Sequence, residues 1–130
     1  MSVGILIILL LATVRSGYSE TEVRVLFDLD GGIYSIRPDG SDLTQISDPV
    51  SANGGWDSAP TGSPDGLKIA FTYQPNGGDY HEIWTMAADG SGRAQLTFPD
   101  SFLGDAAPVW SPVGGSIAFA SYVDPDRASV

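Results

Sequence analysis

The chain has 130 residues, contains no cysteine and carries a net charge of −10, from 16 acidic and 6 basic side chains. This length suits one small domain, and the lack of cysteine excludes a disulfide framework, a thiol nucleophile and a thiolate zinc site. The acidic balance disfavours nucleic acids and anionic lipid surfaces, which bind clustered cations, and leaves cationic partners or metal ions open.

An apolar segment opens the chain. Residues 4–14 are mostly aliphatic and too few to cross a bilayer as a helix. Gly17-Tyr18-Ser19 supplies the small-x-small pattern that a signal peptidase cleaves. No Lys or Arg precedes the apolar run and Arg15 follows it, so an uncleaved anchor and a misassigned start are the alternatives. We expect residues 1–19 to be a signal peptide and the mature chain, 20–130, to be periplasmic or secreted, without stable membrane insertion after cleavage.

The rest of the chain is a series of short extended runs separated by Gly, Pro, Asp and Ser. The turn density leaves no helical period outside the leader, so the chain is expected to be all-β. Nine strands are predicted, at about 23–27, 33–37, 43–46, 59–62, 68–73, 82–87, 94–98, 108–111 and 116–121.

The strands belong to an internal repeat. Ile33–Ser41 recurs 50 residues later as Ile83–Ser91, and Asp57–Pro64 recurs 48 residues later as Asp105–Pro112. Repeats of this length, built from short strands and tight turns, indicate a propeller or solenoid. Closed propellers have about 4 to 8 blades. We therefore predict a partial β-propeller of about two four-stranded antiparallel blades, truncated at the C-terminus, with blade remnants at about 23–47, 58–98 and 106–121.

The repeat motifs resemble a known family. Pro108-Val109-Trp110-Ser111-Pro112 opens one copy, and Ile83-Trp84-Thr85-Met86, Asp89-Gly90-Ser91 and Gln95-Leu96-Thr97 follow in order in the other. Together they resemble TolB-like β-propeller repeats, which are similar to WD40 repeats without the Trp-Asp ending. The resemblance covers nearly all of residues 23–121.

Two positions depart from the family pattern. Gly62 stands where the other copy has Trp110, and Val113 stands where the other copy has Asp65. Burying an indole contributes about 3–5 kcal/mol, judged from large-to-small core substitutions. We therefore expect the second set of strands to be looser than the third, unless Trp56 refills the space.

Catalytic motifs are absent from the sequence. Gly114–Ala118 departs from the nucleophile elbow Gly-x-Ser-x-Gly at its last position, and His81, the single histidine, lies in a predicted loop. Asp28–Gly31 resembles the start of a calcium loop without the rest of its spacing, and a hairpin turn explains it. We expect no enzyme activity, no cofactor and no metal site.

Two aspartates at the repeat entrances are candidates for binding. Asp57 and Asp105 each lie two residues before Ala-Pro, at the start of the innermost strand of a blade. They either hold their loops through hydrogen bonds or, at the mouth of a propeller channel, attract a cation or a basic peptide. The lengthened hairpin at 74–81 is expected at the same end. The predicted binding residues are Trp56, Asp57, Asp79, Tyr80, His81 and Asp105.

The resemblance implies a protein-binding role, since TolB-like propellers bind proteins of the Tol-Pal envelope system. We predict an exported, non-catalytic interaction module for envelope proteins or peptides, a fragment of a longer protein, with possible self-association through open blade edges and no nucleic-acid partner. One alternative is the N-terminal propeller portion of a prolyl-oligopeptidase-type serine peptidase lacking its hydrolase domain. Another is a fragment or pseudogene product without a role of its own.

Overall fold

The computed structural model describes residues 10–15, 21–49, 52, 54–99 and 104–122. Its ten strands are all paired in antiparallel fashion. They are β1 (Leu10–Arg15), β2 (Thr21–Leu29), β3 (Gly32–Ile36), β4 (Thr44–Ser47), β5 (Trp56–Gly62), β6 (Lys68–Gln74), β7 (Glu82–Ala87), β8 (Ala94–Gln95), β9 (Asp105–Trp110) and β10 (Ile117–Ser121).

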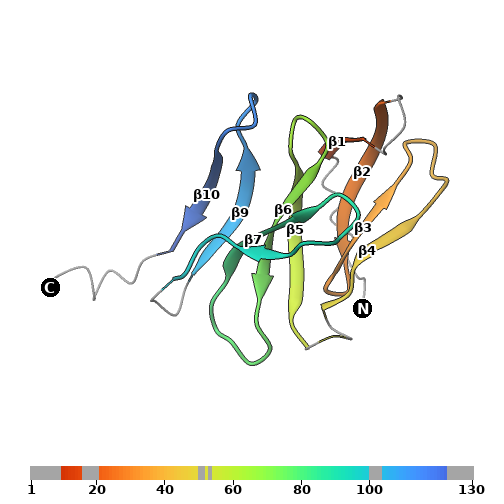
Figure 1. Ribbon diagram of the computed structural model, residues 1–130. Helices are drawn as coiled ribbons and strands as arrows, with labels where there is room; N and C mark the ends of the chain where they lie inside the picture. Colours follow the sequence, from red (N-terminus) through yellow and green to blue (C-terminus); the bar gives the residue numbers. More distant parts are fainter. Residues whose placement is uncertain (1–9, 16–20, 50–51, 53, 100–103, 123–130) are drawn as a thin grey trace, which may run out of the picture.

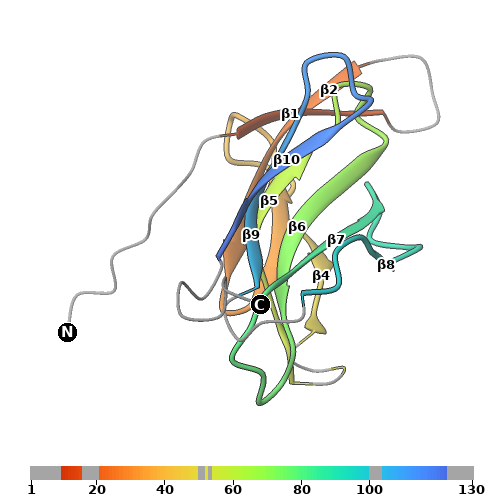
Figure 2. The ribbon, with the colours of Figure 1, turned by 90° about the vertical axis from the view of Figure 1, so that its left-hand side faces the viewer.

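The strands form three sheets that lie side by side like blades (Figure 1). Sheet 1 has the order β1-β2-β3-β4, sheet 2 has the order β5-β6-β7-β8, and sheet 3 pairs β9 with β10. Figure 2 shows the three sheets from a side, with β10 nearest the viewer. Meandering four-stranded sheets of this kind are propeller blades. The prediction of an all-β, partial propeller with about two four-stranded blades is confirmed.

The core lies between sheets 1 and 2. Leu26 and Ile33 of sheet 1 cluster with Ile69, Phe71 and Met86 of sheet 2, and each is at most 1% exposed. Every residue from Ile69 to Tyr73 is buried, because β6 lies inside its sheet with sheets on both of its faces. The sequence reads accordingly as a nearly continuous apolar run rather than an alternating one.

Sheet 3 is more exposed than sheet 2, and the expectation that the second set of strands is looser than the third stays a prediction. None of the residues of β10 is buried, whereas five of the seven in β6 are. Trp56 does not fill the space at Gly62, since it lies at the opposite end of β5 and is 55% exposed. Neighbouring sheets on both faces account for the burial of β6.

The first strand lies within the predicted signal peptide. β1 runs antiparallel to β2 from the pair Leu10 and Leu26 to the pair Arg15 and Thr21, which makes sheet 1 four-stranded rather than three-stranded. The proposed cleavage position, after Ser19, lies outside the described residues. Cleavage there stays a prediction, and it would remove β1. No helix long and apolar enough to cross a membrane is found among the residues that the structure describes.

The two Asp-Gly-Ser turns repeat in atomic detail. Asp39 accepts hydrogen bonds from the backbone nitrogen and the hydroxyl of Ser41, at 2.9 and 2.6 Å, and Asp89 accepts the same pair from Ser91 at 3.0 and 2.6 Å. These bonds lower the pKa of both carboxyls. The glycine has positive φ in each turn, a conformation that glycine adopts without strain. Turn chemistry therefore accounts for these aspartates.

Candidate functional site

The predicted binding residues gather at one end of sheet 2. Trp56 pairs with Gln74 at the start of the β6–β7 hairpin, and the backbone nitrogen of Asp105 donates to the carbonyl oxygen of His81 at 2.8 Å. The first residues of β5 and β9 therefore meet this hairpin, the green loop at the bottom of Figure 1. We call this region the hairpin end. The Asp-Gly turns after β3, β5 and β7 lie at the opposite end.

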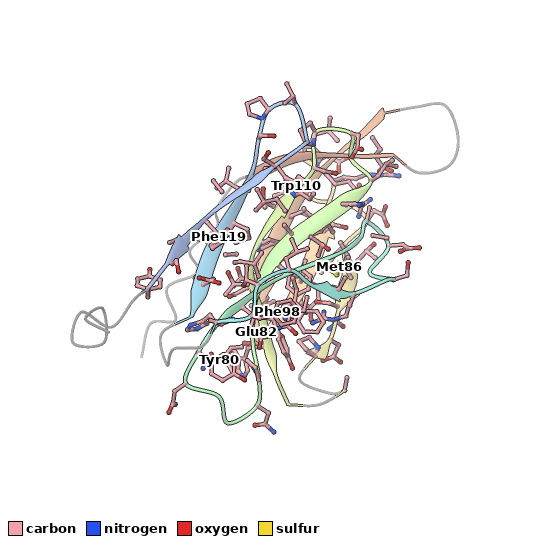
Figure 3. All side chains as sticks on the ribbon, turned by 60° about the vertical axis from the view of Figure 1, so that its left-hand side comes forward. Tyr80, Glu82, Met86, Phe98, Trp110 and Phe119 are labelled. Carbon is pink, nitrogen blue, oxygen red and sulfur yellow. The ribbon has the colours of Figure 1, made fainter. Side chains whose placement is uncertain are left out.

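Burial divides the predicted residues into two groups. Asp57 and Asp105 are 1% and 7% exposed, whereas Trp56 is 55% exposed. Asp79 is also exposed, and Tyr80 and His81 are half-buried. Figure 3 shows Tyr80 projecting at the hairpin end, below Glu82 and Phe98 in that view. An approaching partner therefore meets the aromatic and hairpin groups, and the two repeat-entrance aspartates lie beneath them.

Asp57 joins sheets 1 and 2. Its carboxylate accepts two hydrogen bonds from the guanidinium of Arg93, at 2.6 and 2.9 Å, and one from the hydroxyl of Ser47 at 2.6 Å. Its backbone nitrogen donates to the carbonyl oxygen of Gly31 at 2.9 Å. Ser47 and Gly31 belong to the first repeat and Arg93 to the second. This arrangement favours the anchoring role for Asp57 over a contact with a partner.

Arg93 also covers an aromatic cluster. The carbon of its guanidinium lies 4.7 Å from the ring centre of Phe71, 5.5 Å from that of Tyr73 and 5.6 Å from that of Trp84. Cations are attracted to the faces of such rings. The sequence interpretation missed Arg93. One signal was present in the sequence: the charged Arg93 occupies the repeat position that holds the apolar Leu43 in the first copy.

The backbone of Asp105 holds the start of β9 against the hairpin. Two residues further along β9, the backbone nitrogen of Ala107 donates to the hydroxyl of Thr72 at 3.0 Å. Gly104 has a φ of 69°, and a Cβ there would lie 2.1 Å from the carbonyl oxygen of His81. Only glycine allows this approach. These bonds are made by backbone atoms, so the role of the Asp105 carboxylate stays a prediction.

A charged cluster of a different kind lies toward the opposite end. Arg24 is buried and bridges Glu22 and Asp42 at 3.2 and 2.7 Å, and Arg37 bonds Glu22 at 2.6 Å. The Arg37 hydrogen bond holds the pKa of Glu22 below its usual range, and the Arg24 hydrogen bond does so for Asp42. These charges satisfy one another within sheet 1.

Neither a metal site nor an unpaired buried polar group is found in the part of the chain that the structure describes. Within the described ranges, no three or more His, Cys, Asp or Glu side chains are placed to hold a metal ion. Every buried side-chain nitrogen or oxygen in those ranges has a hydrogen-bond partner. Asp57 and Arg93 thus form a buried link beneath the hairpin end, and Trp56, Asp79 and Tyr80 form its accessible surface.

Repeated antiparallel sheets packed face to face place the chain in the class of β-propeller-type proteins. Among solved structures, it is similar to one from Agrobacterium tumefaciens assigned provisionally as TolB, with a TM-score of 0.59 and 31% identity over 78% of this chain and 34% of that one. The fold and part of the sequence are therefore TolB-like.

Curated proteins give the same relationship over shorter stretches. Two Tol-Pal system proteins TolB from strains of Anaeromyxobacter dehalogenans are 44% and 42% identical over 48 residues, which are 37% of this chain and 10% of each relative. An uncharacterized protein of Agrobacterium fabrum is 36% identical over 90 residues, 69% of this chain and 28% of that protein. No family model matches the chain. The chain thus spans about a third or less of the relatives it matches.

Proposed function

We propose that the chain is a non-catalytic protein-interaction module of the TolB type, exported as part of a longer envelope propeller. Its similarity to Tol-Pal system proteins TolB supports the class of function. The shares of 10% to 34% that it covers of its relatives support a longer parent. A non-catalytic role accords with the same similarity to TolB.

The observation that carries the proposal is the exposed indole of Trp56 at the hairpin end. A tryptophan that is 55% exposed costs solvation energy unless a partner covers it, and tryptophan is enriched among residues that dominate binding energy. Asp79 and Tyr80 lie on the hairpin whose first strand pairs with Trp56. Aromatic groups next to a carboxylate suit a basic or amphipathic peptide, and charge complementarity speeds its association.

Binding of a dye-labelled Lys- and Leu-rich peptide to the full chain tests this proposal by fluorescence anisotropy. Trp56→Ala should weaken binding about tenfold or more, in the range of interface anchors. Asp79→Asn should slow association and flatten the dependence of affinity on salt. Asp57→Asn should lower the melting temperature and leave the salt dependence unchanged, because its carboxylate is spent on Ser47 and Arg93.

Matched controls lie at the opposite end. Leu67→Ala removes an apolar side chain that is 51% exposed. Asp65→Asn removes one charge and keeps the acceptor that bonds Ser63 and Leu67. Both controls should leave peptide affinity unchanged. Equal losses of peptide affinity in Asp79→Asn and Asp65→Asn would mean that the peptide responds to net charge alone. Equal losses in Trp56→Ala and Leu67→Ala would mean that the hairpin end is not a specific site. Either result would show that the proposal is wrong.

A further inference from the structure

Trp56 lies where two hairpins of different sheets meet. The backbone nitrogen of the next residue, Asp57, donates to the carbonyl oxygen of Gly31 at 2.9 Å, in the turn between β2 and β3. Trp56 itself pairs with Gln74, where the hairpin between β6 and β7 begins. Both hairpins belong to sheets that have four strands. The surroundings of Trp56 therefore come from four-stranded blades rather than from the open edge of sheet 3.

Each of the two hairpins carries an exposed carboxylate. Asp30 is exposed at the tip of the β2–β3 hairpin, where Asp30 and Gly31 have φ of 50° and 83°, as is typical of a type I′ turn. Asp79 is exposed on the β6–β7 hairpin. The carboxylate of Asp28, by contrast, accepts a hydrogen bond from the backbone nitrogen of Ala59 at 3.0 Å and so anchors β5. Asp30 and Asp79 are therefore the carboxylates that a partner meets on the hairpins flanking Trp56.

Positively charged side chains lie elsewhere or are already paired. Arg24 and Arg37 belong to the ion-pair cluster toward the opposite end, and Lys68 starts β6 there. Arg93 reaches toward the hairpin end with its guanidinium bonded to Asp57. Among the described side chains, the exposed charges around Trp56 are therefore negative, and such a surface attracts cations.

We infer that Trp56, Asp30 and Asp79 together select an extended segment of a partner protein in which two cationic residues flank one apolar residue. Alternate residues of an extended chain point to the same side, so the pattern is cation-x-apolar-x-cation. The two cations are then about 13 Å apart, and neighbouring sheets pack about 10 Å apart. The apolar side chain covers Trp56, and each cation faces the carboxylate of one hairpin. The inference deepens the proposed protein-binding function and rests on it.

The occupant is a different polypeptide rather than a second copy of these residues. Arg15 and Arg24 are the nearest two basic residues in the sequence, nine positions apart, so the printed sequence contains no segment with cations four positions apart. The net charge of −10 also opposes the association of two copies through an acidic surface. Charge complementarity therefore favours a cationic segment of another protein.

The probe is a dye-labelled peptide, Gly-Ser-Lys-Ser-Leu-Ser-Lys-Ser-Gly, whose binding to the full chain is followed by fluorescence anisotropy at low salt. Two further peptides carry Ser in place of the first or the second Lys. We expect each replacement to weaken binding about two- to fivefold, the effect of one exposed ion pair. In Asp30→Asn one of these two losses should disappear and the other should remain. In Asp79→Asn the opposite loss should disappear.

The substitutions are matched in size and in their effect on the fold. Asn-Gly is a favoured pair for a type I′ turn, so Asp30→Asn removes the charge and keeps the hairpin. Asp39→Asn, at an exposed turn of the opposite end, is the control and should retain both losses. The inference is wrong if Asp30→Asn or Asp79→Asn retains both losses, or reduces the two equally, because the carboxylates would then act only as a diffuse field. A peptide of the same composition with adjacent lysines should bind more weakly, and equal affinity would also overturn the inference.

Trp56→Ala separates this inference from the proposed function. A loss of about tenfold for the Lys-Ser-Leu-Ser-Lys peptide in Trp56→Ala, with unchanged lysine selectivity in Asp30→Asn, would overturn the inference alone. An unchanged affinity in Trp56→Ala would overturn the proposed function as well. The tenfold loss together with the exchange of lysine selectivity between Asp30→Asn and Asp79→Asn is the result that supports both.

Discussion

The bond between Arg93 and Asp57 should be the most costly polar interaction to break. Arg93→Met removes both hydrogen bonds to Asp57 and keeps an apolar stem over Phe71. The Asp57 side chain is 0% exposed, so the variant leaves a buried carboxylate with the Ser47 hydroxyl as its remaining described side-chain partner. Breaking a buried pair on one side costs about 3–5 kcal/mol. Since Arg93 itself is 29% exposed, water enters partly, and we expect a loss of about 3 kcal/mol.

Urea unfolding of the full chain, followed by circular dichroism, measures this loss. With a slope of about 2 kcal/mol per molar urea, the midpoint should fall by about 1.5 M. Asp57→Asn combined with Arg93→Met removes the buried charge as well as its partner. The double variant should therefore be more stable than Arg93→Met alone, with a coupling energy of about 1–3 kcal/mol.

Arg37→Met is the matched control, because Arg37 also pairs with carboxylates but is 49% exposed. Solvent screens such pairs, and its midpoint should change little. The reasoning fails if Arg93→Met and Arg37→Met shift the midpoint equally. It also fails if the double variant is no more stable than Arg93→Met, because the cost would then come from lost packing rather than from an unpaired charge.

Three further predictions follow from the same contacts. If the leader is cleaved, the intact mass of the secreted protein will correspond to a chain that starts at Glu20, and recovery of Met1 in the membrane fraction contradicts cleavage. The purified 20–130 chain will have lost β1 from the edge of β2, and it should self-associate with rising concentration in sedimentation. The lowered pKa values of Glu22 and Asp42 mean that their ion pairs stabilise the fold above the unfolded pKa near 4 and are lost as pH falls through the folded values. The melting temperature should therefore drop below about pH 4, and less so in Glu22→Gln with Asp42→Asn; an equal drop in that variant contradicts the assignment. Trp110→Ala removes the hydrogen bond that the Trp110 indole donates to the carbonyl oxygen of Thr61 at 3.2 Å. The amides of sheet 3 should therefore exchange faster with deuterium, while those of β6 stay protected. Equal acceleration in both would show that sheet 3 does not dock through Trp110.

Short extended runs between turn-forming residues allowed most strands to be predicted from the sequence. β7 spans the predicted residues 82–87, because β-forming and apolar residues stand there between turn formers. β5 and β9 begin three residues earlier than predicted, at Trp56 and Asp105. Ala59 and Ala107 have φ of 48° and 55°, and both strands shift register near them. An alanine with positive φ gives no sequence signal for a bulge of this kind.

Longer-range features could not be predicted from the sequence. An apolar run such as that preceding Arg15 has the same composition in a leader as in a strand, so β1 was read only as a leader. Asp57 and Arg93 are 36 residues apart, and no local periodicity links a carboxylate in β5 to a guanidinium in the connection between β7 and β8. The repeat located Asp57 and Asp105, but burial, which decides between anchoring and binding, depends on how neighbouring sheets pack.

The central proposal, protein binding at the hairpin end, is tested most directly by a titration followed in ¹H–¹⁵N spectra. The full chain is labelled and a purified Tol-Pal system protein is added in steps. The proposal predicts saturable shifts of the Trp56 indole and of the amides of residues 79–81, and none at the turns around Asp39, Asp65 and Asp89. Shifts confined to those turns, or a spectrum unchanged at millimolar partner, would contradict it.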